Sequence, residues 1–504
     1  MISSLVASRW SLVKDLLLCL FSAGLFIFSF PNFNLWLFAW FGFVPLFFAI
    51  QGKSKTKAFL LAYLTGFIFW LGIIYWLIHV TFSGMFVLAL YLALYFGIFG
   101  LIISTYNLQL TTYSFFFIPS AWVLLEYARS HLFTGFPWVL LGYSQYLNLP
   151  VVQIADITGA WGVSFLVMLV NVAIYLAISR LSLVVSEKKK YLVPILCIIV
   201  SLGYGYYRLN QRPTTNDQRP IKISVIQGDI PQELKWDSRL SNYIINKYWD
   251  ISFAAAREKP DLIIWPEAAL PVIVEEEPFY YERAKDLAKE INTPLLLGAV
   301  TFRDNSYYNS ALLLSKEGEL LTRYDKLHLV PFGEYIPLKK TLRFLETIVP
   351  IGDFTPGREY TVFNLPAKFS VLICFEDLFP EISREFIKRG AVFLVNITND
   401  AWFKKTTAPY QHLQASVFRA VENRVFLVRS ANTGVSGFIA PTGKIVSLLA
   451  DKAGNNIFVP GYKSSEISIS GCGLSFYSRY GDIFIAACFF FFVLYGIIAL
   501  RKRP

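Results

Sequence analysis

Glu267, Lys326 and Cys374 are the residues of this sequence whose types and surroundings could support covalent catalysis. Cys374 ends the apolar run Val371-Leu372-Ile373, and acidic residues, a proline and an amphipathic segment follow it. This order predicts a strand, a tight turn and a helix, with the thiol at the turn. There the side chain leaves a rigid strand, and the free N–H groups of the next helix favour a thiolate. The alternative is a buried and inert cysteine.

Two further charged residues stand at the ends of apolar runs. Glu267 follows Trp265 and Pro266 after a short apolar run, and partial desolvation there would raise its pKa and make it a better base. It could instead cap the next segment. Lys326 lies among apolar neighbours, where its charge would lower the pKa of Cys374 and stabilise an oxyanion, unless it is simply a solvated loop residue. Glu334, eight residues further on, could position this lysine or be an exposed acid.

In such a set the carboxylate takes the thiol proton, the lysine holds the oxyanion and the cysteine carries an acyl group. No Ser-His-Asp or Cys-His-Asn order is visible, and His328 and His412 remain possible bases for Cys374. The sequence has four histidines and no Cys/His spacing typical of a metal site. We therefore expect neither a metal nor a cofactor.

The candidate residues lie in a segment of ordinary globular composition, residues 221–470, which follows a polar linker at 208–220. Short β-rich runs alternate there with amphipathic segments, which predicts an α/β domain with sheets covered by helices. The predicted strands are 221–227, 261–265, 294–300, 309–315, 369–374, 391–396, 425–430 and 434–439, and the predicted helices are 238–257, 279–290, 380–389 and 408–424. Cys374 is the only one of five cysteines in this segment, so it is either deeply buried or kept for chemistry.

The rest of the chain predicts a membrane domain. The 504 residues are 55% hydrophobic and 17% aromatic, and the apolar excess lies in residues 1–207 and 481–500. A spanning helix needs about twenty apolar residues. About eight segments qualify, the first two being short: 16–30, 35–50, 58–79, 85–106, 112–130, 157–178, 191–207 and 483–500. No small-residue cleavage pattern follows the first segment, so we do not expect a cleaved signal peptide.

The positive charge is concentrated in the predicted membrane loops. Outside residues 208–470 there are 14 Lys+Arg and 5 Asp+Glu, a surplus of +9, whereas inside there are 32 and 30, a surplus of +2. The basic residues fall in loops on one face, which the positive-inside rule assigns to the cytoplasm. We therefore expect the 221–470 domain outside the cytoplasm and both termini inside it. This distribution gives no support to nucleic-acid binding.

Three smaller features have two interpretations each. The aromatic, Gly-rich loop 133–145 could form an interfacial belt or help line a lipid entrance. Glu126 and Arg129 are spaced to pair on one helix face near a membrane interface, although their role is open. The apolar stretch 342–356 is either a lid that faces lipid or a loop packed on its own domain.

The motifs around the candidate residues resemble the Glu-Lys-Cys signatures of the nitrilase superfamily. They are Trp265-Pro266-Glu267, the block from Lys326 to Val330-Pro331-Phe332-Gly333-Glu334, and Cys374-Phe375-Glu376. The surrounding spans and the motifs at 227–236 and 399–403 narrow the resemblance to the apolipoprotein N-acyltransferase family of the bacterial inner membrane. It extends over essentially the whole chain.

This resemblance implies an αββα sandwich on the periplasmic side and a two-step acyl transfer. Cys374 would take an acyl chain from the sn-1 ester of a phospholipid such as phosphatidylethanolamine. The α-amine of an S-diacylglyceryl-cysteine at a lipoprotein N-terminus would then attack the thioester. On this basis Glu267 is the general base, Lys326 the oxyanion residue and Glu334 a supporting acid.

The resemblance also implies residues that contact substrate, namely Trp236, Glu376 and Trp402. Phe375 stands where the family pattern has tyrosine, so it is at most an apolar contact. The alternatives are a membrane-anchored carbon–nitrogen hydrolase with the same triad and a non-catalytic membrane scaffold. The spans disfavour a small polar substrate, and the complete triad disfavours the scaffold. Eight spans favour a self-contained monomer.

Overall fold

The computed structural model describes residues 2–106, 114–179, 188–211, 219–336, 354–469 and 473–501. The chain divides into two compact units, one formed by residues 1–211 and 480–504 and the other by residues 212–479. Each unit is described by itself. Of the apolar stretch 342–356, residues 342–353 lie outside the described part of the chain.

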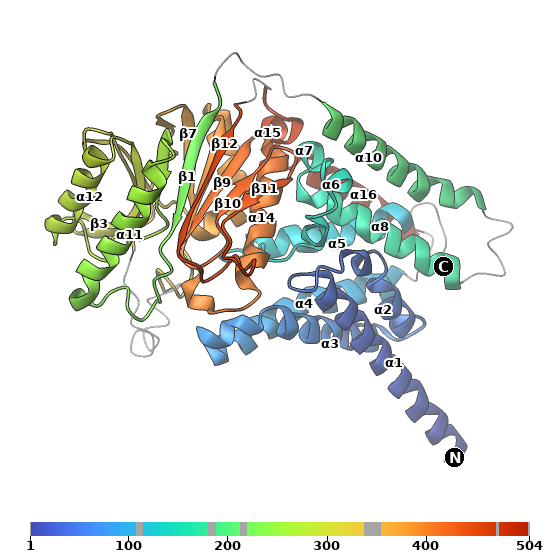
Figure 1. The fold of residues 1–504 in the computed structure, drawn as a ribbon. Coiled ribbons are helices and arrows are strands. Elements are labelled where there is room, and N and C mark those ends of the chain that lie inside the picture. Colours follow the sequence, from blue (N-terminus) through green and yellow to red (C-terminus); the bar gives the residue numbers. More distant parts are fainter. Residues whose placement is uncertain are drawn as a thin grey trace. The chain divides into compact units, whose positions relative to one another are not determined.

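The first unit is helical in its described residues (Figure 1). Five helices are long and apolar enough to cross a membrane, as far as the described residues go, and the count of eight spans stays a prediction. The predicted second span is instead broken into a 3-10 turn and a two-turn helix. The main helices are α1 (Ile2–Ser29), α2 (Phe43–Ile50), α3 (Lys55–Ile73), α4 (Phe82–Tyr106), α5 (Ser114–His131), α8 (Ala160–Ser179), α10 (Leu192–Asn210) and α16 (Ile483–Arg501).

Glu126 and Arg129 on α5 hold the loop that follows the helix. Oε1 of Glu126 accepts a 2.6 Å hydrogen bond from the Leu141 N–H, and Arg129 donates to the carbonyls of Phe136 and Trp138 at 2.7 and 2.8 Å. Most of the loop from Trp138 onward is buried. Both side chains therefore bind the loop that follows α5.

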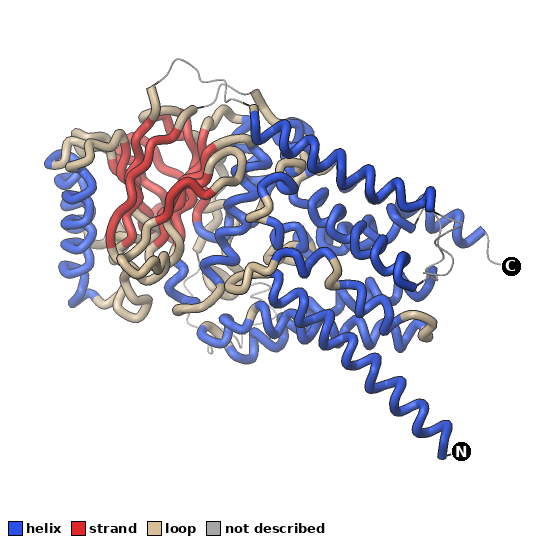
Figure 2. Tube along the Cα trace, turned by 45° about the vertical axis from the view of Figure 1, so that its right-hand side comes forward, coloured by secondary structure: helices blue, strands red, loops and turns tan. Residues whose placement is uncertain are grey.

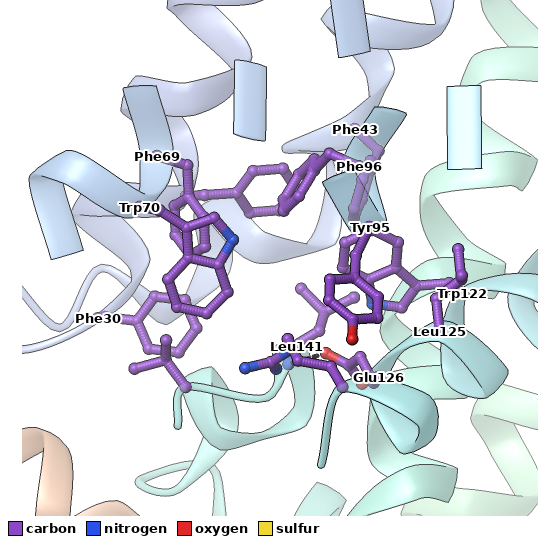
Figure 3. Close-up of a pocket in the computed structure, with 13 residues that line it drawn as sticks. Phe30, Phe43, Phe69, Trp70, Tyr95, Phe96, Trp122, Leu125, Glu126 and Leu141 are labelled. Carbon is purple, nitrogen blue, oxygen red and sulfur yellow. Dashed lines mark hydrogen bonds between the residues drawn. The ribbon is translucent and has the colours of Figure 1, made fainter. Parts of the chain in front are cut away.

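A small cavity of about 20 Å³ lies beside these residues (Figure 3). Aromatic side chains form most of its wall: Phe26, Phe30, Phe43, Phe69, Trp70, Tyr95, Phe96 and Trp122. Within the described part of the chain Oε2 of Glu126 has no hydrogen-bond partner. The cavity has room for about one water molecule, which could satisfy that oxygen.

In the second unit the described strands form two six-stranded sheets, in the orders β12-β1-β2-β3-β4-β5 and β11-β10-β9-β8-β7-β6 (Figure 2). The central strands β1, β2, β3 and β7, β8, β9 run parallel, and their nearly continuous apolar sequences suit burial on both faces. The first sheet contains β1 (Ile221–Gln227), β2 (Leu262–Ile264), β3 (Leu295–Arg303), β4 (Ser306–Leu314), β5 (Leu320–Asp325) and β12 (Gly461–Ile467). The second contains β6 (Phe363–Asn364), β7 (Lys368–Ile373), β8 (Phe393–Thr398), β9 (Phe426–Ala431), β10 (Gly437–Ile439) and β11 (Ile445–Leu448).

Helices cover the outer faces of the two sheets. The first sheet carries α11 (Ser241–Ala256) and α12 (Pro278–Glu290), and the second carries α13 (Pro380–Lys388) and α14 (Ala408–Asn423) (Figure 1). Ser430 of β9 donates across the interface to the carbonyls of Ile226 and Ile264, which ties the sheets together. This αββα sandwich confirms the expected α/β domain, which follows the apolar helices α1 to α10 of the first unit in the chain.

The eight predicted strands and four predicted helices of this domain all exist, with bounds that differ by a few residues. The prediction missed β5, β6, β11 and β12. In β12 the strand is largely polar, and it pairs antiparallel with β1, about 240 residues earlier in the chain. Apolar periodicity does not reveal such a strand, because long-range pairing rather than a buried apolar face places it in the sheet.

Candidate active site

Cys374 occupies the turn that the sequence predicts. Strand β7 ends at Ile373, the 3-10 turn η7 (Cys374–Leu378) follows, and α13 begins with Pro380, whose missing N–H suits the first turn of a helix. The backbone of Cys374 has a φ of 54°, in the left-handed region that a residue with a Cβ seldom occupies. This conformation turns the chain sharply at the residue that carries the thiol.

Glu267 is fixed by one contact from strand β4 and one from the residue that follows β8. Pro266 ends β2 because it cannot donate a ladder hydrogen bond, and Glu267 as a whole residue is only 8% exposed. Its Oε1 accepts from Nδ2 of Asn309 at 2.8 Å, and its Oε2 accepts from the backbone N–H of Asn399 at 2.8 Å. A Cβ on Gly298 would lie 2.7 Å from the Glu267 Cα, so only glycine allows β3 to approach this closely.

Lys326 lies between two carboxylates, at the end of β5. Its Nζ is 2.9 Å from Oε2 of Glu334 and 3.6 Å from Oε1 of Glu267, and the residue is 1% exposed. Burial lowers the pKa of Lys326, but Glu334 and Glu267 more than offset this, so its pKa lies above the ordinary value. The side chain is thus a fixed cation rather than a solvated loop residue.

Asn309 links the two carboxylates and was missed from the sequence. Its Nδ2 donates to Oε1 of both Glu267 and Glu334 at 2.8 Å, and its backbone carbonyl accepts from the Lys326 N–H. Asparagine is disfavoured in strands, so its presence in the predicted strand 309–315 could have marked it as a candidate site residue. Which carboxylates it would meet depends on the strand pairing.

The pKa of Cys374 differs from the sequence-based expectation. Burial raises it well above the ordinary value, the negative charge of Glu267 raises it further, and Lys326 lowers it by less. The cysteine therefore rests as a neutral thiol, and the expected thiolate is not the resting form. The same electrostatic interactions show that Glu267, Lys326 and Cys374 lie close enough together to influence one another.

Glu376 is placed differently from the expected substrate contact. It is fully buried, and its Oε1 accepts from Tyr324 Oη, the Leu327 N–H and the His328 N–H, at 2.8, 2.7 and 3.1 Å. Its Oε2 accepts from the Ile373 N–H at 2.7 Å. Burial raises the pKa of Glu376 to about 7. The carboxylate thus joins the loop after Lys326 to the Cys374 turn, and it does not face solvent.

The predicted aromatic contacts are exposed or partly exposed. Trp236 is 49% exposed and Trp402 51% exposed, and Phe375 packs edge-on against Phe379. The two tryptophan loops are tied together by the Lys404–Glu233 ion pair and by a 2.7 Å hydrogen bond from Asn399 to Gln232. Since the Asn399 N–H also binds Glu267, both tryptophans lie on loops attached to the site.

Lys235 is a second buried cation that sequence reasoning missed. It is 3% exposed, and its Nζ donates to the carbonyl of Glu267 at 3.0 Å. Burial lowers its pKa to about 8, against the opposing effects of Glu267 and Cys374. The sequence pattern offered only its position beside Trp236. A buried lysine whose pKa is lowered this far, at the expense of folding stability, is typical of a functional site.

We expect that replacing Lys235 with methionine will stabilise the protein and impair its activity. The pKa of the lysine is 10.5 in the unfolded protein and about 8 in the folded protein, so its burial destabilises the folded state. This loss of folding free energy is greatest below about pH 8, where the lysine is charged in both states, and it disappears as the pH rises above 10.5. The loss of folding free energy is on the order of 3 kcal/mol at neutral pH. The hydrogen bond from Lys235 to the Glu267 carbonyl offsets part of it. The thermal midpoint should rise by about 2–4 °C in detergent.

The control for this prediction is Lys247→Met, because Lys247 also donates to a backbone carbonyl, that of Asp229, but is less buried. It should leave the thermal midpoint nearly unchanged. A lower midpoint for Lys235→Met would show that the lysine contributes more to stability than its burial costs.

Comparisons with known proteins match both units of the chain. Residues 210–459 match the carbon-nitrogen hydrolase family, and residues 22–173 match the apolipoprotein N-acyltransferase N-terminal domain. An amidase from Nesterenkonia sp. of known structure is 19% identical, with a TM-score of 0.41, over 55% of this chain and 98% of its own. The family match of residues 210–459 identifies the second unit as a carbon-nitrogen hydrolase domain.

Two relatives match nearly the whole chain. Apolipoprotein N-acyltransferase of Geobacter metallireducens is 39% identical over 97% of this chain and 96% of its own length. That of Pasteurella multocida is 32% identical over 85% and 86%. The chain belongs to the apolipoprotein N-acyltransferase family, and it is a membrane-bound acyltransferase.

Proposed function

We propose that this protein moves an acyl chain from the sn-1 position of a phospholipid, such as phosphatidylethanolamine, onto the N-terminal S-diacylglyceryl-cysteine of apolipoproteins. Cys374 carries the acyl group as a thioester between the two steps. The observation that carries this proposal is the set of buried Glu267, buried Lys326 and partly exposed Cys374, in a chain whose relatives are named apolipoprotein N-acyltransferase.

In the first step Glu267 accepts the thiol proton as the Cys374 sulfur attacks the ester carbonyl carbon. Lys326 stabilises the negative charge that forms on the carbonyl oxygen. The carbon–oxygen bond then breaks, Glu267 returns the proton to the leaving alkoxide, and a lysophospholipid departs. A base is needed because Cys374 rests as a neutral thiol.

In the second step the neutral α-amine of the lipoprotein attacks the thioester carbonyl. Glu267 takes a proton from the attacking nitrogen, and Lys326 again stabilises the oxyanion. The carbon–sulfur bond breaks, the thiolate regains a proton from Glu267, and the products are an amide and the free enzyme. Glu334 supports both steps, because it holds Lys326 and shares the Asn309 amide with Glu267.

The exposed apolar side chains on the loops of the site suit lipid substrates. Trp236, Trp402, Leu234 and Phe332 are 49%, 51%, 39% and 51% exposed, on loops joined to Glu267, Lys326 or Glu334. A small polar amide would not require such a surface. We propose Trp236, Phe375 and Trp402 as substrate contacts, and Glu376 as a residue that positions the Cys374 turn.

The protein is placed by this proposal in the bacterial inner membrane, with the catalytic domain periplasmic and both termini cytoplasmic. The domain limits proposed are 1–207 for the first seven spans, 208–220 for the linker, 221–470 for the catalytic domain and 471–504 for the last span and basic tail. In this proposal the protein acts as a monomer, takes the acyl chain from a phospholipid and transfers it to a diacylated apolipoprotein.

The alternative is a membrane-anchored carbon–nitrogen hydrolase. The match of residues 210–459 to the carbon-nitrogen hydrolase family supports this alternative. One experiment separates the two. The purified protein and Cys374→Ala are incubated with phospholipid alone and then analysed by mass spectrometry. A gain of one acyl mass, labile to hydroxylamine and absent from the variant, supports a thioester on Cys374.

Addition of a diacylated peptide should then move the acyl group to the peptide amine. Release of free fatty acid without transfer would favour the hydrolase. No adduct with intact lipid would contradict the phospholipid as acyl donor.

A further inference from the structure

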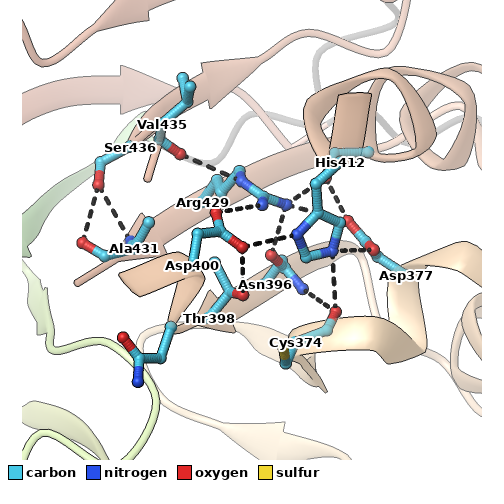
Figure 4. A network of polar contacts seen from close by, with 12 residues as sticks. Cys374, Asp377, Asn396, Thr398, Asp400, His412, Arg429, Ala431, Val435 and Ser436 are labelled. Atoms are coloured by element: carbon cyan, nitrogen blue, oxygen red, sulfur yellow. Dashed lines mark hydrogen bonds and ion pairs between the residues drawn. The ribbon is translucent and has the colours of Figure 1, made fainter. Parts of the chain in front are cut away.

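A closed network of buried charges adjoins the Cys374 turn (Figure 4). Its members are Asp377 of η7, Asp400 of η8 (Asp400–Phe403), His412 of α14 and Arg429 of β9, and none is more than 2% exposed. The two acyl-transfer steps described above use none of these side chains. Burying four ionisable groups destabilises the folded state unless each group is paired. We therefore ask what function this network serves.

The contacts of His412 define its charge. Nδ1 lies 3.1 Å from Oδ1 of Asp400, and Nε2 lies 2.8 Å from Oδ1 of Asp377. Ionised carboxylates only accept hydrogen bonds, so both ring nitrogens carry a proton and the ring is an imidazolium. Burial and Arg429 lower the pKa of His412, but the two aspartates raise it to about 9.

The remaining oxygens of the aspartates bind Arg429, so the network is electrically balanced. NH1 of Arg429 is 3.1 Å from Oδ2 of Asp377, and its NH2 is 3.4 Å from Oδ2 of Asp400. The other charged groups at this face, Arg419 and Glu422 of α14, pair with each other at 2.8 Å. A neutral imidazole would leave the network with an excess negative charge.

The network reaches the nucleophile through one backbone carbonyl. Nε2 of His412 lies 3.3 Å from the carbonyl oxygen of Cys374, and Nδ2 of Asn396 donates to the same oxygen at 3.1 Å. Arg429 in turn holds Asn396, with NH1 2.7 Å from its Oδ1. The left-handed backbone of Cys374 costs about 1–2 kcal/mol and persists only where neighbouring contacts enforce it.

We propose that His412 is a positioning residue for acyl transfer: with Asn396 it holds the Cys374 carbonyl, and so the backbone conformation that presents the thiol to Glu267 and Lys326. This inference rests on the proposed function. The charged ring has no free electron pair, so His412 does not take the thiol proton, contrary to one possibility in the sequence. Misplacement of a reacting group by about 1 Å can cost about 100-fold in rate.

The test compares wild type with His412→Gln, and Asn423→Ala serves as the control. Asn423 is also buried on α14, where it donates to Ser383 Oγ and the Arg419 carbonyl, and the proposed reaction does not use it. In single-turnover assays with phosphatidylethanolamine, His412→Gln should form the thioester about 100-fold more slowly. The lipid concentration at half-maximal rate should change less than about 3-fold. Asn423→Ala should lower the thermal midpoint but acylate at nearly the wild-type rate.

Equal slowing of both variants, or acylation of His412→Gln at the wild-type rate, would overturn the proposal. Alkylation of Cys374 by iodoacetamide, followed on its own peptide, supplies a readout that needs no lipid. It should slow in His412→Gln even if wild type forms no thioester, so failure of the proposed function and failure of this inference are distinguishable.

A third measurement needs no altered nucleophile environment. The four histidines can be labelled with 15N, and NMR of the wild-type protein should show one ring that is doubly protonated at about pH 8. Substitution of His79, His131 and His328 in turn should leave that signal in place, which assigns it to His412 even if His412→Gln does not fold. A neutral His412 ring at about pH 7 would overturn the proposal.

Discussion

Replacing Glu267 with glutamine is expected to slow thioester formation on Cys374 by about 1,000-fold, because the variant has no base for the thiol proton. The change is nearly isosteric. The glutamine side-chain oxygen can still accept the hydrogen bond from Asn309. Its NH2 group then faces the backbone N–H of Asn399, and two donors cannot form a hydrogen bond. We therefore also expect a loss of thermal stability of a few degrees, on the order of 1–2 kcal/mol.

The same variant should make the thiol easier to ionise. The charge of Glu267 raises the pKa of Cys374, so its removal lowers that pKa. The pH profile of iodoacetamide alkylation at Cys374 should then shift to lower pH while acylation by phospholipid is lost. Acylation at more than about a tenth of the wild-type rate would contradict the role of Glu267 as base.

Replacing Lys326 with methionine should also abolish acylation, by about 1,000-fold or more, because no fixed cation would remain at the oxyanion position. Its effect on the thiol should be opposite in sign. Lys326 lowers the pKa of Cys374, so in the variant that pKa rises and the alkylation profile shifts to higher pH. The paired shifts in opposite directions test the arrangement of the three residues without any lipid substrate.

Lys326→Met should destabilise the protein as well. The carboxylates of Glu334 and Glu267 would stay buried without their cation, and breaking a buried ion pair on one side typically costs about 3–5 kcal/mol. The double variant Lys326→Met/Glu334→Gln removes one of these charges and should recover part of the thermal midpoint, though not the activity. No recovery in the double variant would show that Glu334 is not the main partner of the lysine.

Local patterns were sufficient for several parts of this molecule. The division into apolar and globular segments, the turn at Cys374 and the position of Glu267 after a short strand all follow from residues close together in the sequence. An apolar run, a proline or an amphipathic period acts on its own neighbourhood, so the sequence by itself indicates such elements. The predicted helices α11, α12, α13 and α14 were confirmed for the same reason.

Contacts over long sequence separations decided the rest. Asn399 meets Glu267 from 132 residues away, and Asn309 reaches Glu267 and Glu334 only because β4 pairs with β3 and β5. The burial of Lys235 and Glu376, and with it the direction of their pKa shifts, likewise depends on which segments cover them.

The sequence by itself therefore determined which residue types are available for acyl transfer and which elements carry them. Only the tertiary structure decided that Cys374 rests as a thiol, that Lys326 is shared by two carboxylates and that a buried imidazolium adjoins the nucleophile. The physical reason is that burial and neighbouring charge set the protonation of each group, and both arise when distant strands and helices pack together.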